Sequence, residues 1–184
     1  VTVVKDGTPV KMSTRKANFI GLEDLIDDVS SDVTRFFFVM RGMNTHLNFD
    51  LDLAKEQSDV NPIFYIQYAH ARACNLLRRF DGEIDKIDNQ VLSLLTQEQE
   101  VQIITKLMHF PELVRNVSET LEPQMVANYL NELAAMFHSY YAKHKVIDSN
   151  NEDLTSARIY LSNCVKIVIK NGLNLLGVSA PEKM

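Results

Sequence analysis

Apolar side chains recur along most of this chain at intervals of three or four residues, with charged and amide side chains between them. This spacing places the apolar residues on one face of an α-helix. A broad apolar face of this kind runs from Met125 to Tyr140 and predicts one of the longer helices. The pattern predicts helices near residues 22–29, 32–41, 51–54, 62–80, 101–108, 111–117, 123–140 and 154–168.

Residues typical of helix ends accompany several of these stretches. Asp50 can cap the short helix that follows it, and Asn150 or Asn151 can cap the last long helix. Residues 96–99 have the sequence of a capping box, in which two side chains satisfy free N–H groups of a helix start. Gly172 is placed to terminate the last helix, since glycine readily adopts the left-handed conformation of a helix end.

The first residues of the chain do not show the helical period. Residues 1–5 alternate weakly and are rich in β-branched side chains, and Asp6-Gly7 is a turn signal. We expect a strand or hairpin here, followed by a loop at Lys11–Lys16. The predicted fold class is therefore all-α, a helical bundle with a short non-helical N-terminal stub.

The best candidate for a domain boundary lies near Ser58–Asn61. Asn61 can cap a helix, and Pro62 suits its first position because a helix start leaves that N–H unpaired. We therefore divide the chain into residues 1–58 and residues 59–184.

Composition narrows the class of protein. The chain has 184 residues, of which 46% are apolar, and a formal net charge of -5. That charge argues against indiscriminate nucleic-acid binding but permits a local basic face. No apolar run reaches the roughly 18 residues of a membrane span, and the N-terminus does not read as a signal peptide. Cys74 and Cys164 both lie inside helical patterns, which favours a reducing cytoplasm and no disulfides. The sequence does not start with Met, which suggests that it begins inside a longer protein.

The loop at Lys11–Lys16 carries the most specific chemical signal. Its Lys-Met-Ser sequence resembles the mobile loop of class I aminoacyl-tRNA synthetases. When an amino acid attacks the α-phosphate of ATP, lysines and a hydroxyl in such a loop can stabilise the charge that builds on the leaving pyrophosphate. A bare triplet would more often be a solvated basic loop, because short motifs match by chance.

Further segments extend the resemblance over nearly the whole chain. The stretch from Asp32 to Arg35 is similar to the Asp-Ala-Leu-Arg signature of these enzymes. Other stretches resemble the arginyl branch of the family: residues 46–54, Asn61-Pro62, residues 67–72 and residues 171–184. We therefore identify the chain as a C-terminal part of a class I synthetase of the arginyl branch, with the end of the catalytic domain at 1–58 and an anticodon-binding bundle at 59–184.

The resemblance implies an ATP-dependent, AMP-forming arginine–tRNA ligase in the cytoplasm, with Mg²⁺ accompanying ATP. Lys11 and Ser13 would stabilise pyrophosphate, and Arg15 and Lys16 are possible substitutes for the family lysine that Thr14 replaces. No histidine here is followed two residues later by glycine, so the His-Ile-Gly-His element that binds ATP is absent from the sequence. Arginine and ATP would thus bind only to the full-length enzyme, and we expect this chain alone to be inactive.

The resemblance also assigns three residues to the tRNA anticodon: Arg78, Tyr141 and Met184. Guanidinium groups suit phosphates and exposed bases, and aromatic rings stack on unpaired bases. Tyr140 cannot share a helix face with Tyr141 and continues the apolar stripe, so we expect it in the core. The expected partner is tRNA with an arginine anticodon, bound by a monomer without membrane contact.

Some patterns leave two interpretations open. Arg158, Lys166 and Lys170 share one face of the last helix and could follow a phosphate backbone or form an ordinary solvated face. His70 is interpreted as a packing residue, and the other histidines lack metal-ligand spacing, so no metal site is proposed. The rival function is a free-standing helical protein-interaction module that binds no RNA.

Overall fold

The N-terminal hairpin forms as predicted and is joined by a strand that the sequence pattern did not reveal. The computed structural model describes residues 1–12, 20–84 and 87–184. Strand β1 (Thr2–Lys5) pairs antiparallel with β2 (Thr8–Pro9) across a turn in which Asp6 and Gly7 both have positive φ. β3 (Asn48–Asp50) pairs with β1 in parallel, which gives the strand order β2-β1-β3.

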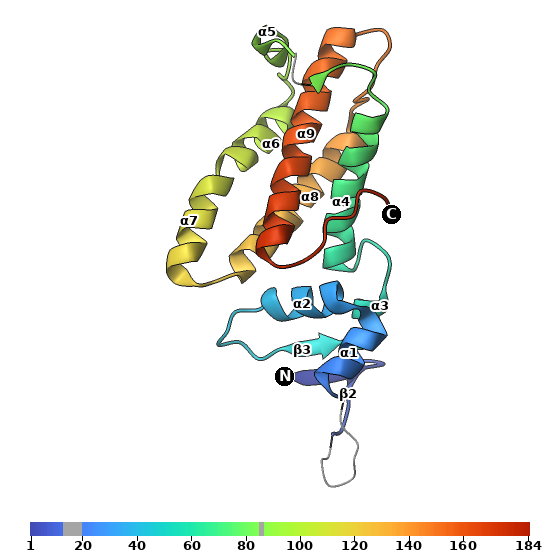
Figure 1. Ribbon diagram of the computed structural model, residues 1–184, viewed down its shortest axis with the longest axis vertical. Helices are drawn as coiled ribbons and strands as arrows, with labels where there is room; N and C mark the ends of the chain where they lie inside the picture. Colours follow the sequence, from blue (N-terminus) through green and yellow to red (C-terminus); the bar gives the residue numbers. More distant parts are fainter. Residues whose placement is uncertain (13–19, 85–86) are drawn as a thin grey trace.

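Three short helices lie next to this sheet: α1 (Leu22–Val29), α2 (Ser31–Val39) and α3 (Leu51–Lys55). Asp50 caps α3 as expected, because its Oδ1 accepts hydrogen bonds from the N–H groups of Asp52 and Leu53, both at 3.0 Å. Sheet and helices form one layer at one end of the elongated molecule (Figure 1).

The remaining helices form the predicted bundle. Its longest members are α4 (Pro62–Arg78), α8 (Gln124–Lys143) and α9 (Glu152–Leu175), which contact one another. Helices α6 (Glu98–Met108) and α7 (Phe110–Thr120) pack on α8, and the short α5 (Asn89–Leu92) lies near the far end of α9 (Figure 1). None of the described helices is long and apolar enough to cross a membrane.

Two expected helix ends are shifted. The capping interaction of α6 lies one residue later than predicted, since the Gln97 N–H donates to Glu100 Oε2 at 3.0 Å. The last long helix begins as expected, with Asn151 Oδ1 accepting from the Leu154 N–H at 3.1 Å. It does not end at Gly172, because Gly172 lies within the helix.

Gly177 terminates α9 instead. Its φ is +68°, its N–H donates to the Asn174 carbonyl, and the Val178 N–H donates to the Leu173 carbonyl, which is the Schellman pattern. Gly172 serves packing: a Cβ at this position would lie 2.6 Å from Leu130 Cδ2. The close approach of α8 and α9 therefore explains that glycine.

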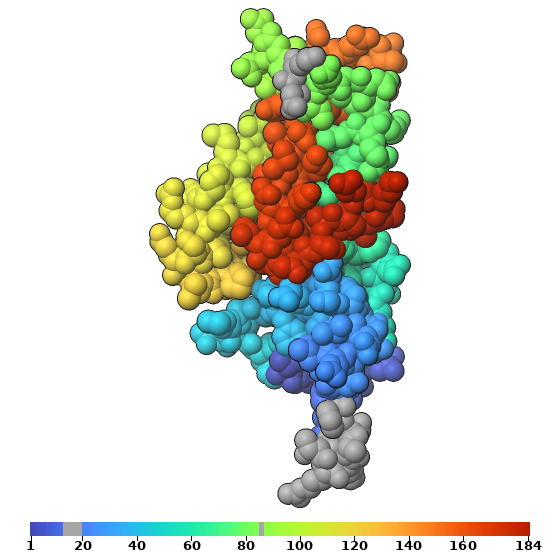
Figure 2. Space-filling model, in the orientation of Figure 1, coloured from blue at the N-terminus to red at the C-terminus, as the bar shows by residue number. Residues whose placement is uncertain are grey.

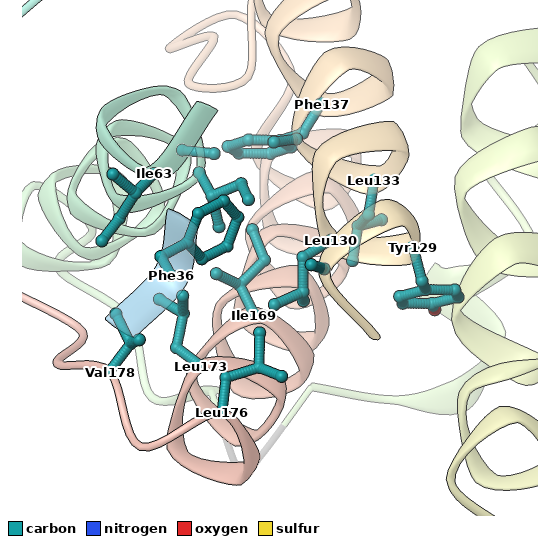
Figure 3. Close-up of a cluster of buried hydrophobic side chains, with 14 of the residues drawn as sticks. Phe36, Ile63, Tyr129, Leu130, Leu133, Phe137, Ile169, Leu173, Leu176 and Val178 are labelled. Carbon is teal, nitrogen blue, oxygen red and sulfur yellow. The ribbon is translucent and has the colours of Figure 1, made fainter. Parts of the chain in front are cut away.

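The two layers share one hydrophobic core. Phe36 of α2 is 1% exposed and inserts among side chains of the bundle (Figure 3). Around it lie Ile63 of α4, Leu173 of α9 and Val178, which follows α9. Tyr140 is fully buried, which confirms its expected place in the core.

Arg158 is not on a solvated face, so both interpretations offered for it are wrong. Its Nε donates to Glu100 Oε1 at 2.8 Å, and Glu100 is fully buried. Tyr140 donates to the same oxygen at 3.2 Å, and burial raises the pKa of Tyr140, with a further contribution from Glu100. A charge buried in this way needs a partner, so Arg158 links α9 to α6 rather than to a ligand.

Candidate functional site

A groove along the exposed face of α4 brings the three predicted anticodon residues together. It is lined by residues of α4, by Tyr141 of α8 and by the chain end, and we call it the α4–α8 groove. Its lining residues are Tyr68, Ala71, Arg72, Asn75, Arg78, Tyr141, Lys183 and Met184. Arg78 and Met184 are exposed and Tyr141 is half-buried, so residues that are distant in sequence share one accessible surface.

The α4 residues reach the groove because of helical spacing. Tyr68, Arg72 and Asn75 follow one another at intervals of four and three residues, which places them on one face. Asn61 fixes the start of this helix: its Oδ1 accepts from the Ile63 N–H, and its Nδ2 donates to the Glu56 carbonyl at 2.8 Å. The opposite face of α4 is buried against α8 and α9.

Two aromatic rings of the groove hold Arg72. Its guanidinium carbon lies 4.6 Å from the centroid of Tyr68 and 4.5 Å from that of Tyr141. Both distances allow cation–π attraction. Sequence reasoning gave Arg72 no role, although the spacing of Tyr68 and Arg72 on one helix could have indicated it.

A histidine beneath the groove further orients Arg72. Arg72 NH1 donates to His138 Nδ1 at 2.5 Å, and His138 Nε2 donates to the Tyr65 carbonyl at 3.1 Å. Burial lowers the pKa of His138, and the charge of Arg72 lowers it further. A neutral imidazole with its proton on Nε2 satisfies both bonds, so the guanidinium is held before any ligand arrives.

The C-terminal tail, residues 178–184, forms one wall of the groove. It crosses α4 (Figure 2) and is hydrogen-bonded to it in order. Gln67 Nε2 donates to the Ser179 carbonyl at 3.0 Å, His70 Nδ1 to the Pro181 carbonyl at 2.9 Å, and Arg78 NH1 to the Glu182 carbonyl at 3.1 Å. One nitrogen of the Arg78 guanidinium is thus already bonded to the tail.

His70 acts as the packing residue that the sequence suggested. It is 1% exposed, and burial lowers its pKa despite the bond to the Pro181 carbonyl, which acts in the opposite direction. A neutral ring suits a position that joins α4 to the tail. Within the described part of the chain, no group of three or more His, Cys, Asp or Glu residues could hold a metal ion.

The other predicted site is only partly described. Lys11 is exposed and follows the hairpin strand β2. Ser13, Arg15 and Lys16 lie outside the described residues, as does Thr14. The structure therefore places the start of the loop next to the sheet, at the end of the molecule opposite α5 (Figure 1).

Comparison with known proteins identifies the family of the bundle. The DALR anticodon binding domain family matches residues 66–184, which include the whole lining of the α4–α8 groove. The chain belongs to this family. The DALR match begins within α4, so the described groove belongs entirely to the family's domain.

Relatives of this DALR-family protein are similar to the whole chain, including its N-terminal layer. The arginine–tRNA ligase of Salinibacter ruber is 48% identical over 185 residues, which cover 100% of this chain and 33% of that protein. A Campylobacter jejuni structure described as an arginyl-tRNA synthetase has a TM-score of 0.86 at 31% identity and covers 100% of this chain and 39% of that one. The Thermus thermophilus arginyl-tRNA synthetase has a TM-score of 0.74 at 26% identity, with 100% and 34% covered. The chain thus spans about a third of the length of its curated relatives.

Proposed function

We propose that this chain is the tRNA-binding part of a larger arginine–tRNA ligase and that the α4–α8 groove receives the anticodon loop. The observation that carries the proposal is the groove itself, which joins a held guanidinium, two tyrosine rings and a chain end inside the region matched by the DALR family. The family match favours this function over a helical interaction module without RNA.

The groove residues suit unpaired bases. An aromatic ring such as Tyr141 can stack on a base and contributes about 1–3 kcal/mol. Arg72, fixed between Tyr68 and Tyr141, can present its remaining N–H donors to base edges or phosphates. Arg78 would bind a phosphate, and the terminal carboxylate of Met184 would accept hydrogen bonds from base edges.

The loop at Lys11–Lys16 has a separate proposed role in the full-length enzyme. Lys11 and Ser13 would stabilise the leaving pyrophosphate, with Arg15 or Lys16 supplying the charge that Thr14 lacks. The parent would activate arginine with ATP, accompanied by Mg²⁺, and release AMP. We also propose that residues 1–58 complete its catalytic domain, that residues 59–184 form the anticodon-binding domain, and that the protein is a cytoplasmic monomer.

The test is a set of dissociation constants for arginine tRNA at two salt concentrations, with helicity checked for each variant. Tyr141→Ala, Arg72→Ala and deletion of Met184 should each weaken binding, by roughly tenfold for Tyr141→Ala. Arg78→Ala should also weaken binding and lower the salt slope by about one unit if Arg78 meets a phosphate. Arg115→Ala, which changes an exposed arginine of α7, is the matched control and should bind like the parent.

Two outcomes would contradict the assignment. Wild-type affinity for Tyr141→Ala and for the Met184 deletion would remove these residues from the anticodon site. Absence of tRNA binding by the unmodified chain, with the expected helical spectrum, would favour the protein-interaction alternative.

A further inference from the structure

Helix α2, in the N-terminal layer, holds the C-terminal tail through two of its side chains. Asp32 Oδ2 accepts a hydrogen bond from the Ser179 N–H at 3.2 Å and a second, short one from the Ser179 hydroxyl. Arg35 lies one helical turn further along α2 and covers Gly177, where an added Cβ would lie 3.2 Å from Arg35 Cδ. The aspartate and arginine of the Asp-x-x-Arg stretch therefore meet the same turn of the chain.

Ser179 is consequently held from two sides. Its N–H and hydroxyl face α2, while its carbonyl accepts from Gln67 of α4. The preceding residue, Val178, is 3% exposed and packs near Phe36 of α2 (Figure 3). The tail thus starts from an anchored point before it crosses α4 towards the groove.

The anchor decides which tail residue meets which residue of α4. Beyond Ser179, the described hydrogen bonds from α4 to the tail are those of His70 and Arg78, and both are made to backbone carbonyls. Carbonyls recur at every residue, so these bonds alone would also fit a tail shifted by one position. Such a shift would move Met184 by roughly 3.3 Å in an extended segment. The Ser179 side chain and its bond to Asp32 select one register.

We propose that Asp32 is a positioning residue for tRNA recognition. By fixing Ser179 it sets the place of Lys183 and Met184 in the wall of the α4–α8 groove. Asp32 itself is not among the residues that line the groove, so it acts through the tail. This inference rests on the proposed function of the groove, although the anchoring can be tested without tRNA.

The first experiment measures amide hydrogen exchange of the tail peptide in the whole chain. Asp32→Ala should raise exchange at the Ser179 amide, whose N–H donates to Asp32, to nearly that of an unstructured peptide, while α4 and α9 stay protected. Asp32→Asn keeps an acceptor oxygen and should show a smaller increase. Asp27→Ala is the matched control, because Asp27 is an exposed aspartate of the adjacent helix α1.

The second experiment measures arginine-tRNA affinity in two backgrounds. In the whole chain, Asp32→Ala should weaken binding roughly threefold to tenfold, because the tail must be ordered again on binding, and Asp27→Ala should not. In a chain that ends at Val178, Asp32→Ala should cause no further loss. A role confined to folding would give the same loss in both backgrounds, since independent effects add.

Several results of these two experiments would overturn the anchoring of the tail or the positioning role of Asp32. Unchanged tail exchange in Asp32→Ala would overturn the anchoring, and faster exchange with unchanged tRNA affinity would overturn the positioning role. An equal affinity loss in the shortened chain would also overturn it. If the unmodified chain binds no tRNA, the proposed function fails together with the positioning role, and the exchange data still report separately on the anchor.

Discussion

Arg158 and Glu100 form an ion pair that water hardly reaches, with side-chain exposures of 11% and 0%. Three donors converge on the Glu100 carboxylate: Arg158 Nε, the Tyr140 hydroxyl and the Gln97 N–H. This network joins α6, α8 and α9 at one point. Because three helices meet at this one carboxylate, single substitutions here test directly what stabilises the bundle.

Removing one partner of this pair should be strongly destabilising. We expect Arg158→Ala to lower the free energy of unfolding by about 3–5 kcal/mol, because it leaves the buried Glu100 charge uncompensated. Urea denaturation followed by circular dichroism gives this value. Lys166→Ala, on the same helix and only half-buried, should change it by less than about 0.5 kcal/mol. Similar values for the two variants would show that the pair contributes little.

His138 should make stability depend on pH. Burial chiefly lowers its pKa from 6.5, so the folded state keeps the ring neutral where the unfolded chain already takes up a proton. Stability is therefore fully present above pH 6.5 and declines as the pH falls below it. We expect His138→Gln, which has no titrating group, to show a shallower decline in urea midpoint between neutral pH and mild acid. His70, whose pKa is shifted in the same direction, should account for part of the slope that remains. An unchanged slope would exclude His138 as a source.

At the scale of elements, helix ends decide how the chain reaches the groove. Gly177 turns the chain out of α9, and Val178 then enters the core while Ser179 meets α2. The direction of the tail therefore depends on a left-handed residue that only glycine adopts without strain.

Gly177→Ala should destabilise the chain by about 1–2 kcal/mol from backbone strain alone, because its φ is positive. The new Cβ would also lie 3.2 Å from Arg35 Cδ, which adds to the cost unless the arginine moves. Thermal unfolding measures the combined effect, with Leu175→Ala as control because Leu175 is 57% exposed in the last turn of α9. A Gly177→Ala variant as stable as this control would refute the strain argument.

At the scale of the whole molecule, the N-terminal layer and the bundle share a core although their expected roles differ. Phe36 joins the core of the bundle, and Asp32 holds the tail that borders the groove. Strand β2, which precedes Lys11, lies at the other side of the layer (Figure 1). One packed unit therefore carries both Lys11 and the groove.

The whole chain should show no arginine-dependent exchange between ATP and pyrophosphate. The expected reason is that a single loop cannot position ATP without the His-Ile-Gly-His element, which the sequence lacks. The measurement is radiolabelled pyrophosphate exchange, with a full-length arginine–tRNA ligase as positive control. Exchange by the purified chain above the background of a Lys11→Ala variant would contradict this expectation.

Local chemistry predicted much of this architecture. Apolar periodicity located the long helices, and Asp50, Asn61 and Asn151 act as caps where the sequence placed them. These features depend on residues a few positions apart, so their signals are contained in short stretches. The family resemblance was likewise carried by short motifs, and it chose Arg78, Tyr141 and Met184. That two helices and the C-terminal tail could bring these residues to one surface was a further prediction.

Only the tertiary structure decided the features that depend on distant partners. A charged residue such as Arg158 is expected at the surface, but it is buried here because α6 supplies Glu100 as its partner. Strand β3 is too short to be recognised from the sequence without β1 beside it. The sequence predicted Gly172 as the end of the last helix, but Leu130 of α8 requires that glycine for packing and Gly177 ends the helix instead. The groove itself exists only once α4, α8 and the tail are assembled. Burial and pairing between elements are properties of the packed molecule, and the order of residues along the chain contains no direct record of them.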